Sequence, residues 1–433
     1  MSAPRRLSST AADFAAEFAR LRDGARGVLA DVEAAVDAII AEVRANGDAA
    51  VAAFTARFDR LDLPPGAHRL PQAALAEAAA ATPPALAEAL RLAAARIEDF
   101  HRRLLPQDFA HTDAAGLRLG LRWSPIEAAG LYVPGGKAAY PSSVLMNAIP
   151  ARVAGVGRVV MCVPAPGGVL NPLVLAAAHL AGIDEVHRIG GTQAVAALAY
   201  GTASIAPVDK IVGPGNAFVA AAKRKVFGRV GIDAIAGPSE VVIIADAAAD
   251  PRLVAIDLLA QAEHDEVAQA ILITPDTSLA DHVAQAVAAD LATLPRAAIA
   301  AASWRDHGAI ITVRSLAEAA ELANALAPEH LELMLVQPDL LMPMIRHAGA
   351  VFLGAHSPEA LGDYVAGPNH VLPTARTARF ASGLSVFDFL KRTTWLEASP
   401  SGLAAIGPAA ALLADAEGLS AHARSIRRRL GAA

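Results

Sequence analysis

Two polar side chains lie three residues apart in an otherwise apolar stretch. The segment LLAQAEHDEVAQAILIT, residues 258–274, carries Gln261 and His264 among Leu, Ala and Ile. Asp250 and Pro251 favour a helix start, and QAILIT is typical of a buried strand, so both polar residues are predicted in the last helical turn before that strand. Residues three apart share a helix face. The pair could bind a metal ion, orient a substrate or satisfy each other.

A second candidate is the adjacent pair Glu329 and His330 in LAPEHLELML. The pair follows a Pro that ends a predicted helix and precedes a predicted buried strand. In a loop, both side chains can reach one pocket. Neutral imidazole accepts a proton near pH 7, and a neighbouring carboxylate can activate water or hold the ring. A surface pair without a catalytic role is the alternative.

Later loops contain further imidazoles and carboxylates. EALGDYVAGPNHVLPT carries Asp363 and His370, and DAEGLSAHARS carries Glu417 and His422. Zinc and manganese bind imidazole nitrogen and carboxylate or amide oxygen. One set of this composition comprises Gln261, His264, Asp363 and His422. Its members are far apart along the chain, so spacing alone does not bring them together. Separately, GPSEVVI places Ser239 at the start of a predicted strand, where a simple turn is the alternative.

Two glycine-rich turns follow predicted strands in the middle of the chain. They are IGGTQA, residues 189–194, and VGPGNAF, residues 212–218. In open parallel sheets, ligands bind outside the carboxyl ends of the strands, where such turns lie. Neither turn has the G-x-G-x-x-G dinucleotide fingerprint, because Phe218 stands where the third glycine would be. A ligand site and a sharp turn explain these glycines equally well.

The elements that must position these residues follow from the periodicity. Residues up to about 105 are predicted to be almost entirely helical, and the pattern changes at a Gly-, Pro- and Ser-rich stretch around Tyr132. Short apolar runs with β-branched residues then alternate with helical segments, and the alternation resumes after Asp250. This alternation predicts βαβ units, parallel sheets and the α/β fold class. The end of the chain is predicted to be helical again.

Composition excludes several classes of protein. The chain has 433 residues, which predicts two or three domains, and its 54% hydrophobic content is typical of a folded globular protein. A net charge of −6 without a substantial basic patch argues against nucleic-acid binding. No run reaches the roughly 20 apolar residues of a membrane span, and the N-terminus lacks a signal peptide's apolar core, so a cytoplasmic location is expected. The only cysteine, Cys162, is expected to be a buried structural thiol.

Eight segments together resemble the histidinol dehydrogenase family, in order and over nearly the whole chain. They are GLYVPGG, GGTQAVAALAYGT, VDKIVGPGNAFV, AGPSEVVIIAD, QAEH, APEHLEL, LGDYVAGPNHVLPT and EGLSAH. The resemblance implies NAD-linked oxidation of L-histidinol to L-histidine through L-histidinal, in two successive hydride transfers that end histidine biosynthesis. It also implies a homodimer with shared active sites and no nucleic-acid or membrane partner.

The resemblance also implies roles for individual residues. His330 would take the alcohol proton, and Glu329 would activate water. One zinc ion per subunit would be bound by Gln261, His264, Asp363 and His422 of the partner subunit. The implied NAD contacts are Tyr132, Gln193 and Asn216. The implied substrate contacts are Ser239, Gln261, His264, His330, Asp363, Glu417 and His422, with Ser142 and His370 as additional candidates.

The implied fold consists of two incomplete Rossmann-like parallel-sheet domains with a helical N-terminal region and a helical C-terminal tail. Residues 1–26 would form an N-terminal helical segment. Residues 27–132 and 238–378 would form the first Rossmann-like domain, with most zinc and substrate residues. Residues 133–237 would form the second, which binds NAD, and residues 379–433 would form a helical tail that contributes to the partner's site.

Three alternative functions differ in what they require. A paralogue of the same family that oxidises another polar alcohol, such as a sulfonated diol, has no need of Glu417 together with the Glu329–His330 pair. A zinc hydrolase, in which Glu329 activates a metal-bound water, leaves the implied NAD contacts without a role. A structural zinc protein has no need of the Glu329–His330 pair.

Overall fold

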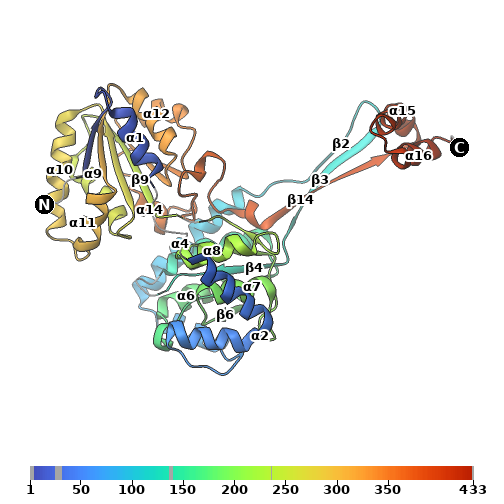
Figure 1. Ribbon diagram of the computed structural model, residues 1–433, viewed down its shortest axis with the longest axis horizontal. Helices are drawn as coiled ribbons and strands as arrows, with labels where there is room; N and C mark the ends of the chain where they lie inside the picture. The colour runs from blue at the N-terminus through green and yellow to red at the C-terminus, as the bar shows by residue number, and fades with distance from the viewer. Residues whose placement is uncertain (1–3, 25–31, 136–139, 236, 432–433) are drawn as a thin grey trace.

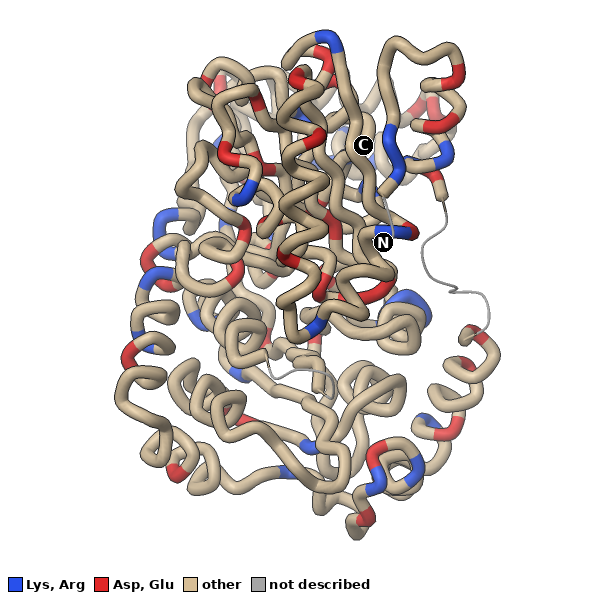
Figure 2. Tube along the Cα trace, turned by 90° about the vertical axis from the view of Figure 1, so that its left-hand side faces the viewer, with Lys and Arg blue, Asp and Glu red and all other residues tan. Residues whose placement is uncertain are grey.

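Two parallel sheets form the body of the molecule, and an antiparallel arm extends away from it (Figure 1). The computed structural model describes residues 4–24, 32–135, 140–235 and 237–431. None of the helices in these ranges is long and apolar enough to cross a membrane. Figure 2 shows the two lobes of the body one above the other, with acidic and basic residues interspersed along the outer helices. The predicted α/β class is confirmed.

The larger sheet has six parallel strands in the order β1-β11-β10-β9-β12-β13. Its strands are β1 (Arg5–Ser8), β9 (Glu240–Ala245), β10 (Gln269–Thr274), β11 (Ala309–Thr312), β12 (His330–Met334) and β13 (Ala350–Leu353). Successive strand residues face opposite sides, so Val241 and Val242 belong to different cores. Helices α9 (Pro251–Ala262), α10 (Thr277–Leu291) and α11 (Ala297–Asp306) cover one side. Helices α1 (Phe14–Asp23) and α12 (Leu316–Leu326) cover the other.

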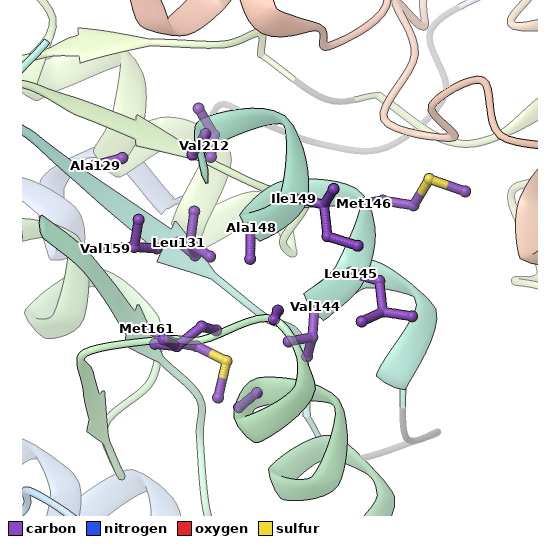
Figure 3. Packing of buried hydrophobic residues seen from close by; sticks show 14 of the residues in the cluster. Ala129, Leu131, Val144, Leu145, Met146, Ala148, Ile149, Val159, Met161 and Val212 are labelled. Atoms are coloured by element: carbon purple, nitrogen blue, oxygen red, sulfur yellow. The ribbon is translucent and has the colours of Figure 1, made fainter. Parts of the chain in front are cut away.

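The smaller sheet has five parallel strands in the order β6-β5-β4-β7-β8. Its strands are β4 (Ala128–Tyr132), β5 (Arg158–Cys162), β6 (Glu185–His187), β7 (Lys210–Val212) and β8 (Gly231–Ile232). One side is covered by α3 (Gln72–Ala81), α4 (Pro84–Arg103), α5 (Pro141–Ala154) and α6 (Pro172–Leu180). Figure 3 shows this packing, in which Val144 and Ala148 of α5 lie against Leu131 and Met161. The other side is covered by α2 (Glu33–Asp59), α7 (Gly191–Tyr200) and α8 (Ala217–Val226).

Both sheets share one topology. If β4 to β8 are renumbered 1 to 5 along the chain, the five-stranded sheet has the order 3-2-1-4-5. The same renumbering of β9 to β13 gives the same order in the six-stranded sheet, where β1 is added beside the third strand. This is the Rossmann order without its sixth strand, so the prediction of two incomplete Rossmann-like sheets is confirmed. The order reverses between β4 and β7 in one sheet and between β9 and β12 in the other. These reversal points position both parts of the candidate site.

The arm is a three-stranded antiparallel sheet of β2 (Phe109–Thr112), β3 (Leu117–Pro125) and β14 (Leu390–Ala398). Trp395 of β14 lies across Gly120 of β3, where a Cβ atom would fall 2.1 Å from the indole ring. Two helices, α15 (Pro400–Ala416) and α16 (Ser420–Arg429), pack on each other at the far end of the arm (Figure 1). The helical end of the predicted tail is thus present.

The remaining elements are short. They are α13 (Pro338–Leu341), α14 (Glu359–Tyr364) and 3₁₀ turns at Pro166–Gly168, Met342–Met344, Thr377–Arg379 and Val386–Phe389. Cys162 is fully buried in β5, as expected.

Three expectations about boundaries differ from the structure. The N-terminal segment is not only helical, because β1 pairs in parallel with β11 at the sheet edge. Residues 33–103 cover the five-stranded sheet and not the six-stranded one, because the apolar faces of α2, α3 and α4 belong to the two cores of the five-stranded sheet. They contact residues 238–378 only at their edge, where Arg96 of α4 donates to the carbonyl oxygens of Val365 and Ala366. The tail from 379 is not only helical. Val386 and Phe389 pack into a core of the five-stranded sheet, and β14 follows, whose pairing with β3 satisfies its backbone groups.

A buried histidine pair holds the loop after α2 against the end of β6. His68 Nδ1 and His187 Nδ1 are 3.0 Å apart, and both side chains are buried. The Ser204 hydroxyl donates to Asp48 Oδ1 at 2.7 Å, so it accepts from His68 Nε2 at 3.0 Å. Burial and, to a smaller extent, the nearby His68 together lower the pKa of His187 to about 4, although Glu185 partly opposes the shift.

We predict that this pair makes the protein less stable in mild acid. Because the folded pKa of His187 is about 4 and the usual value is about 6.5, the unfolded chain binds a proton that the folded chain does not. The contribution is fully present above pH 6.5 and is lost as pH falls through about 4. The unfolding free energy of the wild-type protein should fall between these pH values. In His187→Asn this fall should be smaller by up to about 3 kcal/mol. Urea unfolding measures the difference. The exposed-residue control His179→Asn should keep the wild-type slope, and an unchanged slope in His187→Asn contradicts the prediction.

Candidate active site

A cavity of about 300 Å³ opens at the carboxyl edge of the five-stranded sheet. Its walls include Tyr132, Gln193 and Asn216, the three residues predicted to contact NAD. Tyr132 ends β4, Gln193 lies in the first turn of α7, and Asn216 is the N-cap of α8. The cavity therefore lies where the strand order reverses between β4 and β7, the usual ligand position in such sheets.

The glycine-rich turns shape this cavity through close packing. Gly190 lies against Pro164, where a Cβ atom would fall 2.4 Å from the proline Cβ, and Gly191 has a φ of +61°. The Tyr132 hydroxyl accepts a hydrogen bond from the Gly191 N–H at 3.0 Å. Burial raises the pKa of Tyr132 to about 12, so the phenol stays protonated. Helices α7 and α8 both begin at the cavity, and helix N-termini favour anionic groups such as diphosphates.

A second group of polar residues lies at the amino edge of the six-stranded sheet. We call Ser239, Gln261, His264, Glu329, His330, Asp363 and His370 the polar cluster. Glu329 immediately precedes β12, and Ser239 immediately precedes β9, the neighbouring strand. Helices α9 and α14 run back from their strands, so their ends deliver Gln261 and Asp363 to the same edge. The predicted proton-transfer pair thus lies in a buried cluster and not on the surface.

Glu329 is buried and receives a backbone hydrogen bond. Its Oε2 accepts from the N–H of Glu240 at 3.0 Å. Burial raises the pKa of the Glu329 carboxyl well above its usual range, and the carboxylates of Glu240 and Asp363 raise it further. Such a shift moves a carboxyl toward the range in which a general base works near neutral pH.

His330 presents an unpaired nitrogen to the cluster. Its Nδ1–H donates to the carbonyl oxygen of Glu240 at 3.2 Å. Its Nε2 has no hydrogen-bond partner within the described ranges and lies 3.7 Å from Asp363 Oδ1. Burial lowers the pKa of His330 to about 4, against an opposing effect of Asp363, so the imidazole is neutral at pH 7. A neutral ring with a free Nε2 is suited to accept a proton.

Three of the four predicted metal ligands belong to this cluster. His264 lies two residues beyond α9 and not in its last turn, yet its Nδ1–H still donates to the Ala260 carbonyl at 2.9 Å. That bond leaves Nε2 available, as in metal-bound histidines. The hydrogen-bonding groups around the buried Gln261 amide assign its nitrogen to the side that faces Glu359, where it donates at 3.0 and 3.1 Å, and its oxygen to the opposite side.

The residues of one chain fit part of a zinc site. Across the described ranges, no group of three His, Cys, Asp or Glu side chains could hold a metal ion. Of the predicted set, only His264 and Asp363 are of these types and lie in the polar cluster, with Gln261 as the third ligand there. Glu417 and the fourth ligand, His422, lie on α15–α16 at the far end of the arm, so the chain does not bring them to its own cluster (Figure 1).

Hydrogen bonds from His370 connect the polar cluster to the five-stranded sheet. Its Nδ1–H donates to the Asp363 carbonyl at 2.9 Å, which leaves Nε2 to accept from Ser143 at 3.3 Å. Ser143 lies in the first turn of α5, beside the predicted Ser142, just after the cavity residue Tyr132 and β4. The carboxyl edge of one sheet therefore meets the amino edge of the other.

Sequence reasoning placed Asp257 on the helix face of Gln261 but missed three buried acids near these sites, which are Glu359, Glu332 and Asp59. Glu359 is 2% exposed and contacts both Gln261 and His330. Behind it, Glu332 Oε1 accepts from the Glu359 N–H at 2.8 Å. Burial raises the pKa of Asp257 to about 6 and that of its neighbour Glu332 to about 8. An acid inside the apolar run LELML was the available signal for Glu332. No comparable signal pointed to Asp59, which lines the cavity.

Comparison with known proteins places the chain in a family. The family model for histidinol dehydrogenase matches residues 25–430. The chain is 64% identical to a histidinol dehydrogenase of Gluconobacter oxydans, over 98% of this chain and 99% of that protein. It is 61% identical to one of Cereibacter sphaeroides, over 99% and 98%. A crystal structure of histidinol dehydrogenase from Elizabethkingia anophelis superposes with a TM-score of 0.95 at 35% identity, covering 100% of this chain and 99% of that one. The chain therefore belongs to the histidinol dehydrogenase family.

Proposed function

We propose that the protein oxidises L-histidinol to L-histidine through L-histidinal, with two NAD⁺ reduced for each substrate, in the cytoplasmic final steps of histidine biosynthesis. The observation that carries this proposal is the meeting of two sheet edges. One edge holds a cavity lined by Tyr132, Gln193 and Asn216, and the other holds the buried pair Glu329 and His330. A hydride acceptor and a proton acceptor would then face the same carbon atom.

A bound nicotinamide would supply the hydride acceptor. In the first oxidation, His330 Nε2 would take the proton of the substrate hydroxyl as hydride leaves the carbon. Glu329 then takes a proton from water as the water oxygen adds to the aldehyde, and His330 returns its proton to the carbonyl oxygen, which forms the hydrate and leaves the imidazole neutral again. In the second oxidation, His330 takes a proton of the hydrate as a second hydride leaves. The balance is one alcohol, one water and two NAD⁺ giving one carboxylate, two NADH and three protons. The neutral state of His330 and the raised pKa of Glu329 support these roles.

Zinc is proposed as a second cofactor, one ion per subunit. The ligands would be Gln261, His264, Asp363 and His422 of the partner subunit, and the free Nε2 of His264 is the observation that fits best. When bound, zinc would anchor the imidazole and amino nitrogens of the substrate. Ser239 and the partner subunit's Glu417 would complete the contacts. Holding both ends of the amino aldehyde retains it for the second hydride transfer.

The dimer is proposed because the arm carries residues that its own chain does not use. Glu417 and His422 are exposed at the end of the arm. The helix that precedes them leaves Leu412 and Leu413 69% and 65% exposed. Apolar surface of this kind favours burial against another surface. A second subunit, related by a two-fold axis, would supply that surface. Its polar cluster would receive Glu417 and His422 from the arm of the first subunit.

The stoichiometry tests this function directly. One L-histidinol should yield two NADH and one L-histidine, because the proton acceptors for both oxidations are present. NADH absorbance and chromatographic measurement of substrate, aldehyde and product provide the ratio. One NADH with accumulating aldehyde contradicts the two-step assignment. Cleavage without NADH would indicate a hydrolase, and preference for a polar alcohol without imidazole would indicate a different substrate class.

The two half-reactions should separate the roles of the proton acceptors. His330→Asn should slow oxidation of both histidinol and histidinal by about 10²- to 10⁴-fold, since it loses a general base. Glu329→Gln should slow mainly oxidation of histidinal, because only that step needs an activated water. Separate assays with each substrate measure the effects. The exposed-residue controls His282→Asn and Glu321→Gln should match wild type. Loss of histidinol oxidation alone in Glu329→Gln would reverse the assignment.

A further inference from the structure

An unused carboxylate lies in the wall of the cavity at the five-stranded sheet. Asp59 is the last residue of α2, and Arg60 then ends the helix in the left-handed region with a φ of +53°. Only 9% of Asp59 is exposed, and it lines the cavity together with Tyr132 and Gly190. No sequence motif singled out this residue.

Three features indicate that Asp59 destabilises the folded protein when no ligand contacts it. Burial raises the pKa of its carboxyl, against the one backbone hydrogen bond that it accepts from Ala165. Its Oδ2 is buried and has no hydrogen-bond partner in the part of the chain that the structure describes. A negative charge at the C-terminal end of a helix also opposes the helix dipole. A buried acceptor without a donor is typical of a site that a ligand completes.

The position of Asp59 in the fold indicates the kind of donor. In Rossmann folds, an acidic residue about 20 residues after the glycine fingerprint accepts a hydrogen bond from the ribose 2′-hydroxyl of NAD. That residue stands near the end of the second strand. Here the second strand is β5, and the residues that follow it, VPAPGG at 163–168, include no acid. Asp59 is bound to the backbone of Ala165 in that same segment, although it comes from α2.

The rest of the cavity suits the remaining parts of a dinucleotide. Ile39, Phe58 and Pro166 give the cavity apolar walls, against which a flat base can pack. The N-termini of α7 and α8 provide N–H groups for a diphosphate. A vicinal diol between the base and the diphosphate would place its hydroxyls within reach of a carboxylate acceptor.

We propose that Asp59 accepts hydrogen bonds from the vicinal hydroxyls of the adenine-linked ribose and thereby selects NAD over NADP. This inference rests on the proposed NAD-linked function. A 2′-phosphate would replace a donor with two negative charges next to a buried carboxylate, and like charges at low dielectric repel strongly. The acid that discriminates the two cofactors comes from a helix outside the sheet, which explains the absence of the usual one.

Substitution of Asp59 tests the selection. In Asp59→Asn, KM for NAD should rise about 10- to 100-fold, the range expected for hydrogen bonds to a charged group, with kcat nearly unchanged. The ratio of kcat/KM for NADP to that for NAD should rise by at least the same factor. Asp62→Asn, three residues on and exposed, is the matched control and should behave as wild type. An unchanged cofactor ratio in a folded Asp59→Asn enzyme overturns the proposal.

Ligand binding by the wild-type protein tests the same selection without relying on the folding of the Asp59→Asn variant. Calorimetry should show that ADP-ribose binds and that 2′-phospho-ADP-ribose binds at least about tenfold more weakly, a difference equivalent to one hydrogen bond to a charged group. Equal affinities, or no binding of ADP-ribose, overturn the role of Asp59. If ADP-ribose binds with this preference but histidinol yields no NADH, the proposed function fails while the assignment of Asp59 holds.

Discussion

The hydrogen bonds of His370 join the two Rossmann-like sheets where their active edges meet. One nitrogen donates to the Asp363 carbonyl and the other accepts from Ser143 in the first turn of α5. In the proposed reaction, the cofactor would bind on one sheet and the substrate on the other. Because a hydride moves only between atoms in contact, that arrangement would require a fixed junction. Asn369, the preceding residue, donates to the Met146 carbonyl of the same helix at 2.5 Å. The junction is therefore anchored at two adjacent residues.

The electrostatics of the polar cluster favour a cationic occupant. Burial and mutual repulsion raise the pKa values of Glu329 and Glu359 well above their usual range. Glu332 and Asp257 are two further acids beside this group, and burial raises their pKa values as well. Without a cation, such a group must hold protons to avoid uncompensated buried charge. A metal ion or a substrate ammonium group would allow more of these carboxyls to ionise, which couples their protonation to occupancy of the site.

The sequence alone predicted the alternation of strands and helices, since buried parallel strands and their covering helices have distinct periods. It did not predict which sheet the helices between residues 33 and 103 cover, because an amphipathic helix shows that a partner exists but not which one. Strands β1 and β14 were missed because each pairs with a strand distant in sequence. For the site, the chemistry of Gln261, His264, Glu329 and His330 was visible in the residue types, but their assembly came from family resemblance. Glu359 and Asp59 escaped both routes, since acids are usually exposed.

The central claim is that each polar cluster is completed by the arm of a second subunit. The most direct measurement combines His264→Ala in one chain with His422→Ala in the other, using two affinity tags to purify the heterodimer. If the ligands come from different chains, one of the two sites is intact, so the heterodimer should recover about half of wild-type activity and bind half as much zinc as the wild-type dimer. A purified heterodimer that remains inactive and binds no zinc would contradict the claim, because each site would then be built within one chain.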